Sequence, residues 1–134
     1  MAVRTFLDTS VLISGWRGVS VRQIKALTIL CDPNREFICS PYVKLELMPK
    51  LLWHKYPLEV KFYEEYFLKV NSWSDDLQKM NNEAMRLGEK YGLSAMDALY
   101  IAASYLSEVA EFITAERPHS PLLRVQEFNV VSIY

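Results

Sequence analysis

The sequence predicts one α/β domain in which a parallel β-sheet is flanked by helices on both faces. The 134 residues suit one domain with one core, and 51% of them are hydrophobic, which favours a packed interior over disorder. Short apolar runs typical of strands alternate with longer helical patterns. Strands separated by helices indicate a parallel sheet, whereas a sandwich or barrel needs many more strands. No linker, low-complexity tract or repeat divides the chain.

Four segments are predicted to be strands. The first, Val3–Leu7, contains Val, Thr and Phe and stops at Asp8, where we expect the chain to enter a loop. The second is Glu36–Cys39, the third is Glu111–Ala115 and the last is Asn129–Tyr134. Each is short enough to be one strand of a single sheet.

The helical segments are recognised by their spacing and their caps. The first starts at Ser20 or Val21 and ends at Leu30, with apolar residues at helical intervals. Ser40-Pro41 resembles an N-cap followed by proline at the first helical position. The helix after it includes Pro49, which is expected to kink or shorten it. The remaining predictions are helices over Leu58–Val70, Leu77–Tyr91 and Ala95–Leu106, a C′ glycine at Gly92, and a short helix or turn over Leu122–Glu127.

Charge, cysteines and hydropathy restrict the class of protein. The net charge of −1 comes from 15 basic and 16 acidic residues. If four acids gather at one site, the rest carries 15 basic against 12 acidic residues, or +3, which is too weak a bias to indicate nucleic acid by itself. We expect a cytoplasmic protein without a membrane partner, because no signal peptide opens the chain and the apolar stretch Ala98–Leu106 is too short to span a bilayer. Cys31 and Cys39 are expected to be buried thiols.

Two of four candidate acids occupy positions at which open parallel sheets bind ligands. Asp8 and Glu116 each follow a predicted strand, at its carboxyl end. Asp97 lies in the first turn of an apolar helix, and Glu46 borders the apolar stripe of the helix after Ser40. Acids beside apolar surface are costly unless they are paired or bind a metal. We therefore expect these four side chains to line one pocket.

Four carboxylates without a cation would repel one another, and some of their pKa values would rise. A divalent metal ion removes this repulsion. Carboxylate ligands favour Mg²⁺ or Mn²⁺, whereas Zn²⁺ prefers His or Cys. Such ions bind substrate phosphate in addition to their carboxylate ligands. The acids therefore indicate metal-assisted displacement at phosphorus.

Each acid also has a purely structural interpretation. Asp8 suits a turn, and Glu46 and Glu116 suit exposed positions. Ser94-Ala95-Met96-Asp97 matches a capping box, in which Asp97 reaches back to the N-cap amide. The helix that follows is apolar nearly all round, so its N-terminus is expected to point into the molecule. The helix dipole there favours an ionised carboxylate.

Four segments resemble motifs of the PIN-domain ribonuclease family, in matching order across nearly the whole chain. The first is Phe6-Leu7-Asp8-Thr9-Ser10-Val11-Leu12-Ile13, and the second is Ser40-Pro41-Tyr42-Val43-Lys44-Leu45-Glu46-Leu47. The third and most specific is Leu93-Ser94-Ala95-Met96-Asp97-Ala98-Leu99-Tyr100-Ile101-Ala102-Ala103, and the fourth is Phe112-Ile113-Thr114-Ala115-Glu116.

The resemblance implies a PIN-like fold and Mg²⁺- or Mn²⁺-dependent cleavage of RNA. It implies that Asp8, Glu46 and Asp97 form the metal site and that Glu116 completes it. It also implies that nearby hydroxyls, here Thr9, Ser10 and Thr114, support the metal ions or the phosphate. Lys44 and Arg117, near the ends of the motifs, are candidates for contact with RNA phosphates.

Many stand-alone bacterial members of this length are VapC-like toxins, which dimerise and are held inactive by a small antitoxin. The resemblance therefore implies a small antitoxin partner and a homodimer. The segment from Trp53 to Trp73 is rich in aromatic residues. Most of these should be core, and an exposed remainder would form an interface.

Two other functions are open. The fourth acid of the family is usually Asp, and the longer Glu116 would displace or weaken a second metal ion. This leaves a catalytically weakened PIN-fold module that binds RNA or acts as a scaffold. A haloacid-dehalogenase-type phosphohydrolase also begins with an apolar strand that ends in Asp. It generally needs a second Asp two residues after Asp8, where this chain has Ser10, and it gives Asp97 no role.

Overall fold

The computed structural model describes residues 1–134 and contains one sheet of five parallel strands in the order β3-β2-β1-β4-β5. The strands are β1 (Val3–Leu7), β2 (Arg35–Cys39), β3 (Ser72–Trp73), β4 (Glu111–Thr114) and β5 (Asn129–Ser132). The predicted α/β architecture is therefore confirmed.

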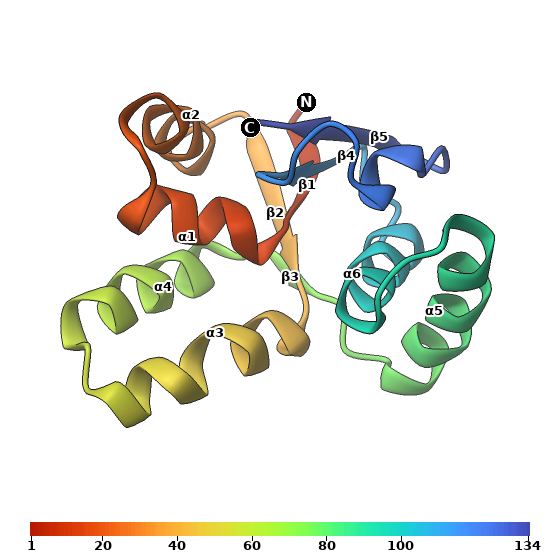
Figure 1. Cartoon of the computed structure of the whole chain (residues 1–134), viewed down its shortest axis with the longest axis horizontal. Coiled ribbons are helices and arrows are strands. Elements are labelled where there is room, and N and C mark those ends of the chain that lie inside the picture. Colours follow the sequence, from red (N-terminus) through yellow and green to blue (C-terminus); the bar gives the residue numbers. More distant parts are fainter.

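Helices cover both faces of the sheet. In Figure 1, α1 to α4 lie on one side of the sheet, and α5 and α6 lie on the other. The helices are α1 (Thr9–Arg17), α2 (Ser20–Leu30), α3 (Pro41–His54), α4 (Pro57–Lys69), α5 (Leu77–Tyr91) and α6 (Ala95–Leu106), with a 3₁₀ turn η1 (Pro121–Arg124). None of them is long and apolar enough to cross a lipid bilayer.

The strand order creates a switch point between β1 and β4. From β1 the chain proceeds to β2 and then to β3 on one side, and it later returns to place β4 on the other side of β1. In open parallel sheets, ligands bind beyond the carboxyl ends of the strands at such a switch point. Asp8, directly after β1, therefore lies at the edge where a binding site is expected.

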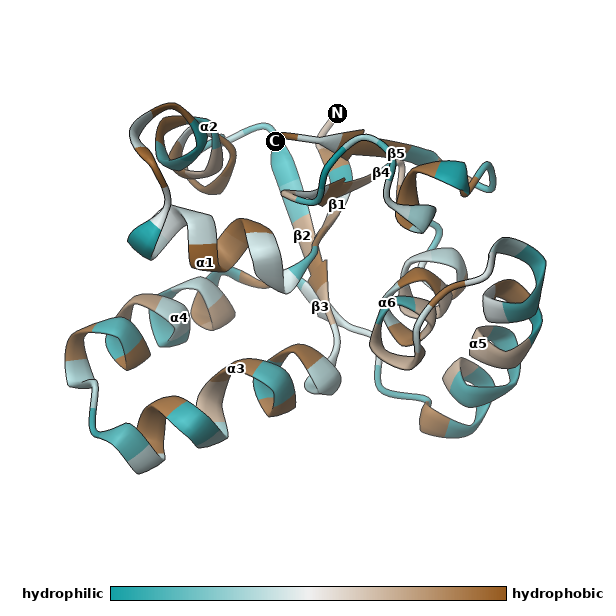
Figure 2. Cartoon of the chain, in the orientation of Figure 1, coloured by the Kyte–Doolittle hydropathy of each residue, from teal (hydrophilic) through white to brown (hydrophobic).

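The buried side chains form one hydrophobic cluster of 28 residues around this central strand. Phe6, fully buried in β1, stacks on Phe112 of β4 with ring centroids 5.6 Å apart and lies 5.8 Å from the ring of Tyr100 on α6. The central strands are accordingly hydrophobic, whereas α5 carries hydrophilic residues along its length (Figure 2). The core thus joins β1 and β4 to α6, the three elements that carry or adjoin Asp8, Glu116 and Asp97.

Two predictions of local structure were wrong. The chain does not enter a loop at Asp8: this residue is the N-cap of α1, which starts at once with Thr9. The polar stretch between α4 and α5 includes the two-residue strand β3, which pairs with the end of β2. The helix α3 begins as predicted, with Ser40 Oγ accepting a hydrogen bond from Tyr42 N, and it continues through Pro49 to His54.

The helix α2 has the predicted bounds, and part of its apolar spacing faces outward. Val21 and Ile24 are 65% and 64% exposed, whereas Ala26 and Leu30 are buried. The first part of the apolar spacing therefore faces outward while its end at Leu30 is buried, and hydrophobic residues recur along this peripheral helix (Figure 2). The prediction of two buried thiols was also wrong in part, because Cys31, directly after α2, is exposed.

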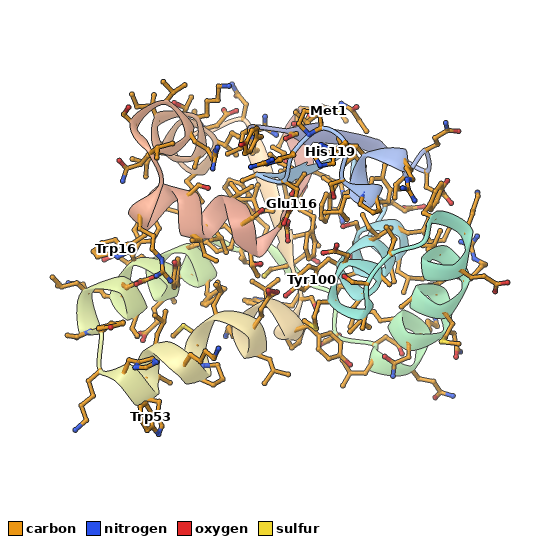
Figure 3. All side chains as sticks on the ribbon, viewed as in Figure 1. Met1, Trp16, Trp53, Tyr100, Glu116 and His119 are labelled. Carbon is orange, nitrogen blue, oxygen red and sulfur yellow. The ribbon has the colours of Figure 1, made fainter.

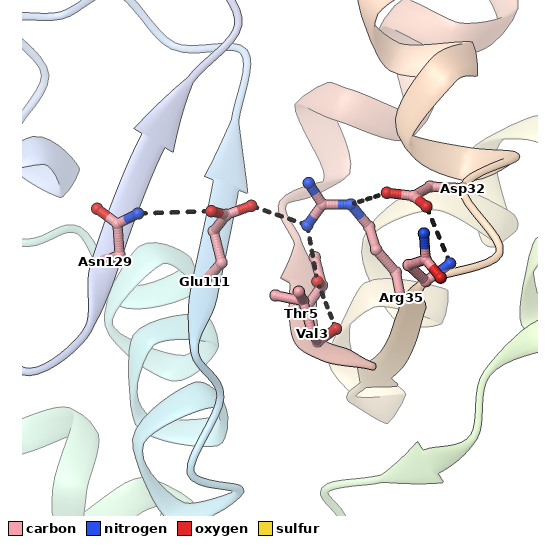
Figure 4. A network of polar contacts seen from close by, with 7 residues as sticks. Val3, Thr5, Asp32, Arg35, Glu111 and Asn129 are labelled. Atoms are coloured by element: carbon pink, nitrogen blue, oxygen red, sulfur yellow. Dashed lines mark hydrogen bonds and ion pairs between the residues drawn. The ribbon is translucent and has the colours of Figure 1, made fainter. Parts of the chain in front are cut away.

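A polar network links the strands near their amino ends, on the opposite end of the sheet from Asp8 (Figure 4). Arg35 donates to Thr5 Oγ1 at 2.9 Å and to Glu111 Oε1 at 2.8 Å, and it forms an ion pair with Asp32. Asn129 of β5 donates to the other oxygen of Glu111 at 3.4 Å. The network thus links β2, β1, β4 and β5. It holds the guanidinium of Arg35 away from the carboxyl ends of the strands, where Asp8 lies.

Candidate active site

Asp8 is held by two hydroxyl groups at the carboxyl edge of the sheet. Its side chain is 4% exposed, and Oδ2 accepts hydrogen bonds from Ser10 Oγ and Thr114 Oγ1, each at 2.8 Å. Its backbone N–H donates to Ile113 O at 2.9 Å, which extends the β1–β4 ladder by one residue. Asp8 caps α1 with its backbone alone, so its carboxylate points to the site and makes no cap hydrogen bond.

Glu46 approaches the same region from the exposed side of α3. Thr9 Oγ1 donates to both of its carboxylate oxygens at 3.2 Å, and the buried hydroxyl of Tyr100 donates to Oε1. Burial and this bond to Glu46 raise the pKa of Tyr100 well above its ordinary value. Tyr100 therefore remains a neutral donor that orients Glu46.

Glu116 and Asp97 complete the group. Glu116 is exposed just after β4, and its backbone N–H donates to Thr114 Oγ1 at 3.1 Å. Asp97 is half-buried in the first turn of α6, one helical turn before Tyr100. Figure 3 shows Glu116 and Tyr100 in the central region where α1, α3 and α6 meet.

Burial and the charges of other acids in the group raise the pKa values of the two more buried ones, Asp8 and Asp97. Burial raises the pKa of Asp8 from 3.8 to about 6, against the hydrogen bonds from Thr114 and Ser10, and the charges of Asp97 and Glu46 add to the rise. Burial also raises the pKa of Asp97, a bond from Ser94 opposes the rise, and the charges of Glu116 and Glu46 add to it. Elements far apart in the sequence thus bring the acids together, while their roles as ligands stay predictions.

The donor set fits a hard divalent ion. None of the four acids belongs to any ion pair of the molecule, so their mutual repulsion has no cation to offset it. As the side chains stand, no three acids, histidines or cysteines are close enough to enclose a metal ion. Mg²⁺ needs only one or two carboxylates, because it keeps several waters and binds substrate phosphate. The arrangement therefore suits an ion with an open coordination sphere.

The other predicted residues divide into two groups. The hydroxyls of Thr9, Ser10 and Thr114 all contact the carboxylates, as described above. Lys44 lies apart from the acids, with its ammonium group 4.6 Å from the ring centroid of Trp73 and 5.3 Å from that of Phe67. Arg117 is exposed beside Glu116.

Sequence reasoning treated Tyr100 only as an apolar position of α6. The available signal was its spacing, because residues three apart on a helix share a face, and Tyr100 is three residues after Asp97. A tyrosine on the face of a predicted acidic site is a candidate hydrogen-bond donor to that site. Its partner on α3 was not visible in the sequence.

We expect the stability of the metal-free protein to depend on the charge of Asp8. Both the folded and the unfolded states protonate Asp8 below about pH 3.8, and only the folded state retains the proton up to about pH 6. The contribution of Asp8 to stability therefore falls as the pH rises from about 4 to 6, by about 3 kcal/mol in all. Urea unfolding in EDTA should show Asp8→Asn gaining stability relative to the wild type between pH 4 and pH 7. A constant difference between the two proteins would contradict the raised pKa.

The same measurement distinguishes the two interpretations of Asp97. Ser94, the N-cap of α6, makes no side-chain cap hydrogen bond, so the capping box is incomplete, and the bond from Ser94 to Asp97 can be kept by the oxygen of Asn. In EDTA, Asp97→Asn should be as stable as the wild type or more so, because repulsion from Glu46 and Glu116 is relieved. It should lose Mn²⁺ binding in calorimetry. A loss of about 1 kcal/mol with normal Mn²⁺ binding would instead identify Asp97 as a cap.

The molecule is thus an α/β protein with a PIN-like fold and an acidic group at the switch point of its sheet. Two solved structures share this fold. A chain of a toxin–antitoxin complex from Klebsiella pneumoniae aligns with a TM-score of 0.70 and 21% identity, over 97% of this chain and 98% of that chain. A chain of VapBC2 from Rickettsia felis, bound to a DNA fragment from their promoter, aligns with a TM-score of 0.72 and 14% identity, over 96% and 97%. No protein-family model and no curated protein matches the sequence.

Proposed function

We propose that the protein is a Mg²⁺- or Mn²⁺-dependent ribonuclease that hydrolyses RNA phosphodiester bonds. The observation that carries the proposal is a set of four carboxylates around the carboxyl ends of a parallel sheet, whose charges act on one another and none of which is paired with a cation. Such a group, with a buried member of raised pKa, is unfavourable unless a cation offsets it. A divalent ion bound there supplies an activated water and stabilises charge on a phosphate.

Each acid has a distinct place in this proposal. Asp8 and Asp97 would hold the main ion, since these two are the more buried and their charges are coupled. Glu46 would orient the attacking water, with Thr9 and Tyr100 fixing its carboxylate. The exposed Glu116 would hold a second, weaker ion together with the RNA phosphate.

The hydroxyl groups of Ser10 and Thr114 fix the relative positions of α1 and β4 at the site. Ser10 donates to Asp8 and also accepts from Ala115 N at 2.9 Å, so it connects the start of α1 to the end of β4. Thr114 connects Asp8 to the backbone of Glu116 in the same way. These bonds hold Asp8 and the backbone of Glu116 at fixed relative positions, which favours reaction because little reorganisation is needed.

We further propose that the protein is the toxin of a toxin–antitoxin pair, forms a homodimer and is inhibited by a small antitoxin. The likeness of fold to chains from two toxin–antitoxin complexes supports this role. Exposed apolar side chains on α2 and around the α3–α4 connection support protein partners: Val21, Ile24, Leu52, Trp53, Tyr56 and Leu58.

The test is to map the ends of RNA cut by the purified protein. Attack by water with departure of the ribose 3′-oxygen should leave 5′-phosphate ends, and 2′-O-methyl at the cleavage site should not prevent cleavage. Cleavage should require Mg²⁺ or Mn²⁺ and stop in EDTA. Cyclic 2′,3′-phosphate ends, or full cleavage in EDTA, would refute the mechanism. The Asp8→Asn/Asp97→Asn double variant controls for a contaminating nuclease.

A further inference from the structure

A cleft of about 560 Å³ opens directly beside the acidic group. Ser10 and Glu116 line it on the side of the acids, and Arg22, Arg117, His119 and Tyr134 line the rest. Ser10 donates to Asp8, so the cleft is continuous with the site described above. Its size is in the range of cavities that bind small ligands.

Two arginines without carboxylate partners contact the ring of Tyr134 in this cleft. The guanidinium of Arg22 lies 4.2 Å from the ring centroid, and that of Arg117 lies 5.3 Å from it. Neither arginine takes part in an ion pair. The Nε atom of Arg22 is buried and has no hydrogen-bond partner. A buried charged donor without an acceptor is unfavourable, so an anionic acceptor bound beside Arg22 Nε would be stabilising.

The orientation of α2 places Arg22 in this cleft. The side of α2 that packs inward carries Arg22, Ala26 and Leu30, at helical spacing, while Val21 and Ile24 face outward. Gln23 donates to Gly15 O at 3.2 Å and thereby fixes the first turn of α2 against α1. An arginine on the inward face of a helix with apolar residues outside is the reverse of ordinary amphipathic packing.

We propose that this cleft binds a second phosphate of the RNA strand, next to the phosphate held at the four acids. The proposal rests on the proposed function, whose substrate it extends toward α2. Planar guanidinium groups match the oxygens of phosphate, and Glu116, the one acidic side chain that lines the cleft, is shared with the acidic group. The ring of Tyr134 already contacts both guanidiniums, so it braces them and does not serve as a stacking platform for a base.

The test measures binding without hydrolysis. A fluorescent single-stranded RNA of mixed sequence is titrated in EDTA at several salt concentrations against the wild type, Arg22→Gln and Arg117→Gln. Each variant should weaken binding roughly tenfold at low salt, as expected when a charge-assisted hydrogen bond is removed. The slope of log affinity against log salt should fall by about 0.7 for each phosphate that is no longer bound.

Lys25→Gln is the matched control, because it removes one positive charge from an exposed position of the same helix. It should leave the salt slope unchanged. Arg22→Lys should recover the slope while recovering only part of the affinity, since it keeps the charge and loses the planar fork. Circular dichroism confirms that each variant is folded.

If Arg22→Gln and Arg117→Gln behave as Lys25→Gln does, the two arginines only brace Tyr134 and the proposal is overturned. The result is separable from the proposed function. RNA binding that depends on the arginines, in a protein that cuts no RNA, would support the phosphate subsite and count against the ribonuclease. Cleavage of RNA by the protein, together with an unchanged salt slope in both variants, would support the ribonuclease and count against the phosphate subsite.

Discussion

Asp8→Asn is expected to lower RNA hydrolysis on the order of a thousandfold, because Asp8 is a main metal ligand in the proposed mechanism and its loss would remove several kcal/mol of transition-state stabilisation. Asparagine keeps the shape of the side chain and an oxygen that accepts from Ser10 and Thr114. The effect should therefore come from the lost charge. Single-turnover cleavage measures the loss of hydrolysis, and Mn²⁺ calorimetry on the same preparation measures the loss of metal binding.

The control is Asp75→Asn, which removes a carboxylate from an exposed position outside the acidic group and should leave both readouts unchanged. The double variant Asp8→Asn/Asp97→Asn should lose little more than either single variant, since residues that act as a unit are not additive. Losses that multiply in the double variant would show that the two acids act independently. Normal Mn²⁺ binding by Asp8→Asn would remove Asp8 from the metal site.

Phe6→Ala is expected to have the largest effect on stability, a loss of about 3–5 kcal/mol, as is typical when a fully buried phenylalanine is truncated. The cavity would lie between the rings of Phe112 and Tyr100. Neither ring makes another aromatic contact with β1. Because Tyr100 orients Glu46, the variant should also weaken the site in the fraction that remains folded. Urea unfolding measures the loss.

Leu68→Ala serves as the comparison, since Leu68 is 87% exposed and its truncation should change stability by no more than about 0.5 kcal/mol. Equal effects of the two substitutions would contradict the packing of β1 against β4 and α6.

Elements with strong periodicity and caps were predictable from the sequence. Ser40-Pro41 marks the start of α3, and Gly92 ends α5 in the left-handed region with φ of 68°. Because Asp8 and Glu116 directly follow strands, the rule for parallel sheets placed them at one edge. The hydroxyl and Tyr100 contacts were not predictable in detail, because they depend on side-chain directions that join three different elements.

The helix α1 was missed because its residues have weak intrinsic preference for a helix. Thr9, Ser10 and Val11 open it, and Gly15 lies within it. Tertiary packing decides instead: a Cβ atom at Gly15 would lie 3.1 Å from Leu30 Cδ1 and 3.2 Å from Phe62 Cζ. The absence of a side chain at Gly15 thus allows α1 to approach α2 and α4 closely.

The inward position of Arg22 was also not predictable from the sequence, because tertiary packing decides it. The sequence of α2 showed only that apolar residues recur at helical spacing, and a buried apolar stripe is the usual arrangement. The structure buries a narrower set that includes Ala26 and Leu30. Which face of a helix turns inward depends on its partners, and here a close contact with α1 decides it. The strand β3 was missed because two residues carry no periodic signal.

The order of the strands also governs when the acidic group can assemble during biosynthesis. Asp8 is made early, but Thr114, which binds it, is 106 residues further along the chain. On the ribosome, β1 has β2 as a partner first, and its other edge stays open until β4 has been translated. Parallel pairing of such distant segments is slow, because a long loop must close before any contact forms. In a nascent chain, Asp8 and Glu116 therefore stay apart until β4 has been translated, and the acidic group can assemble only after that point.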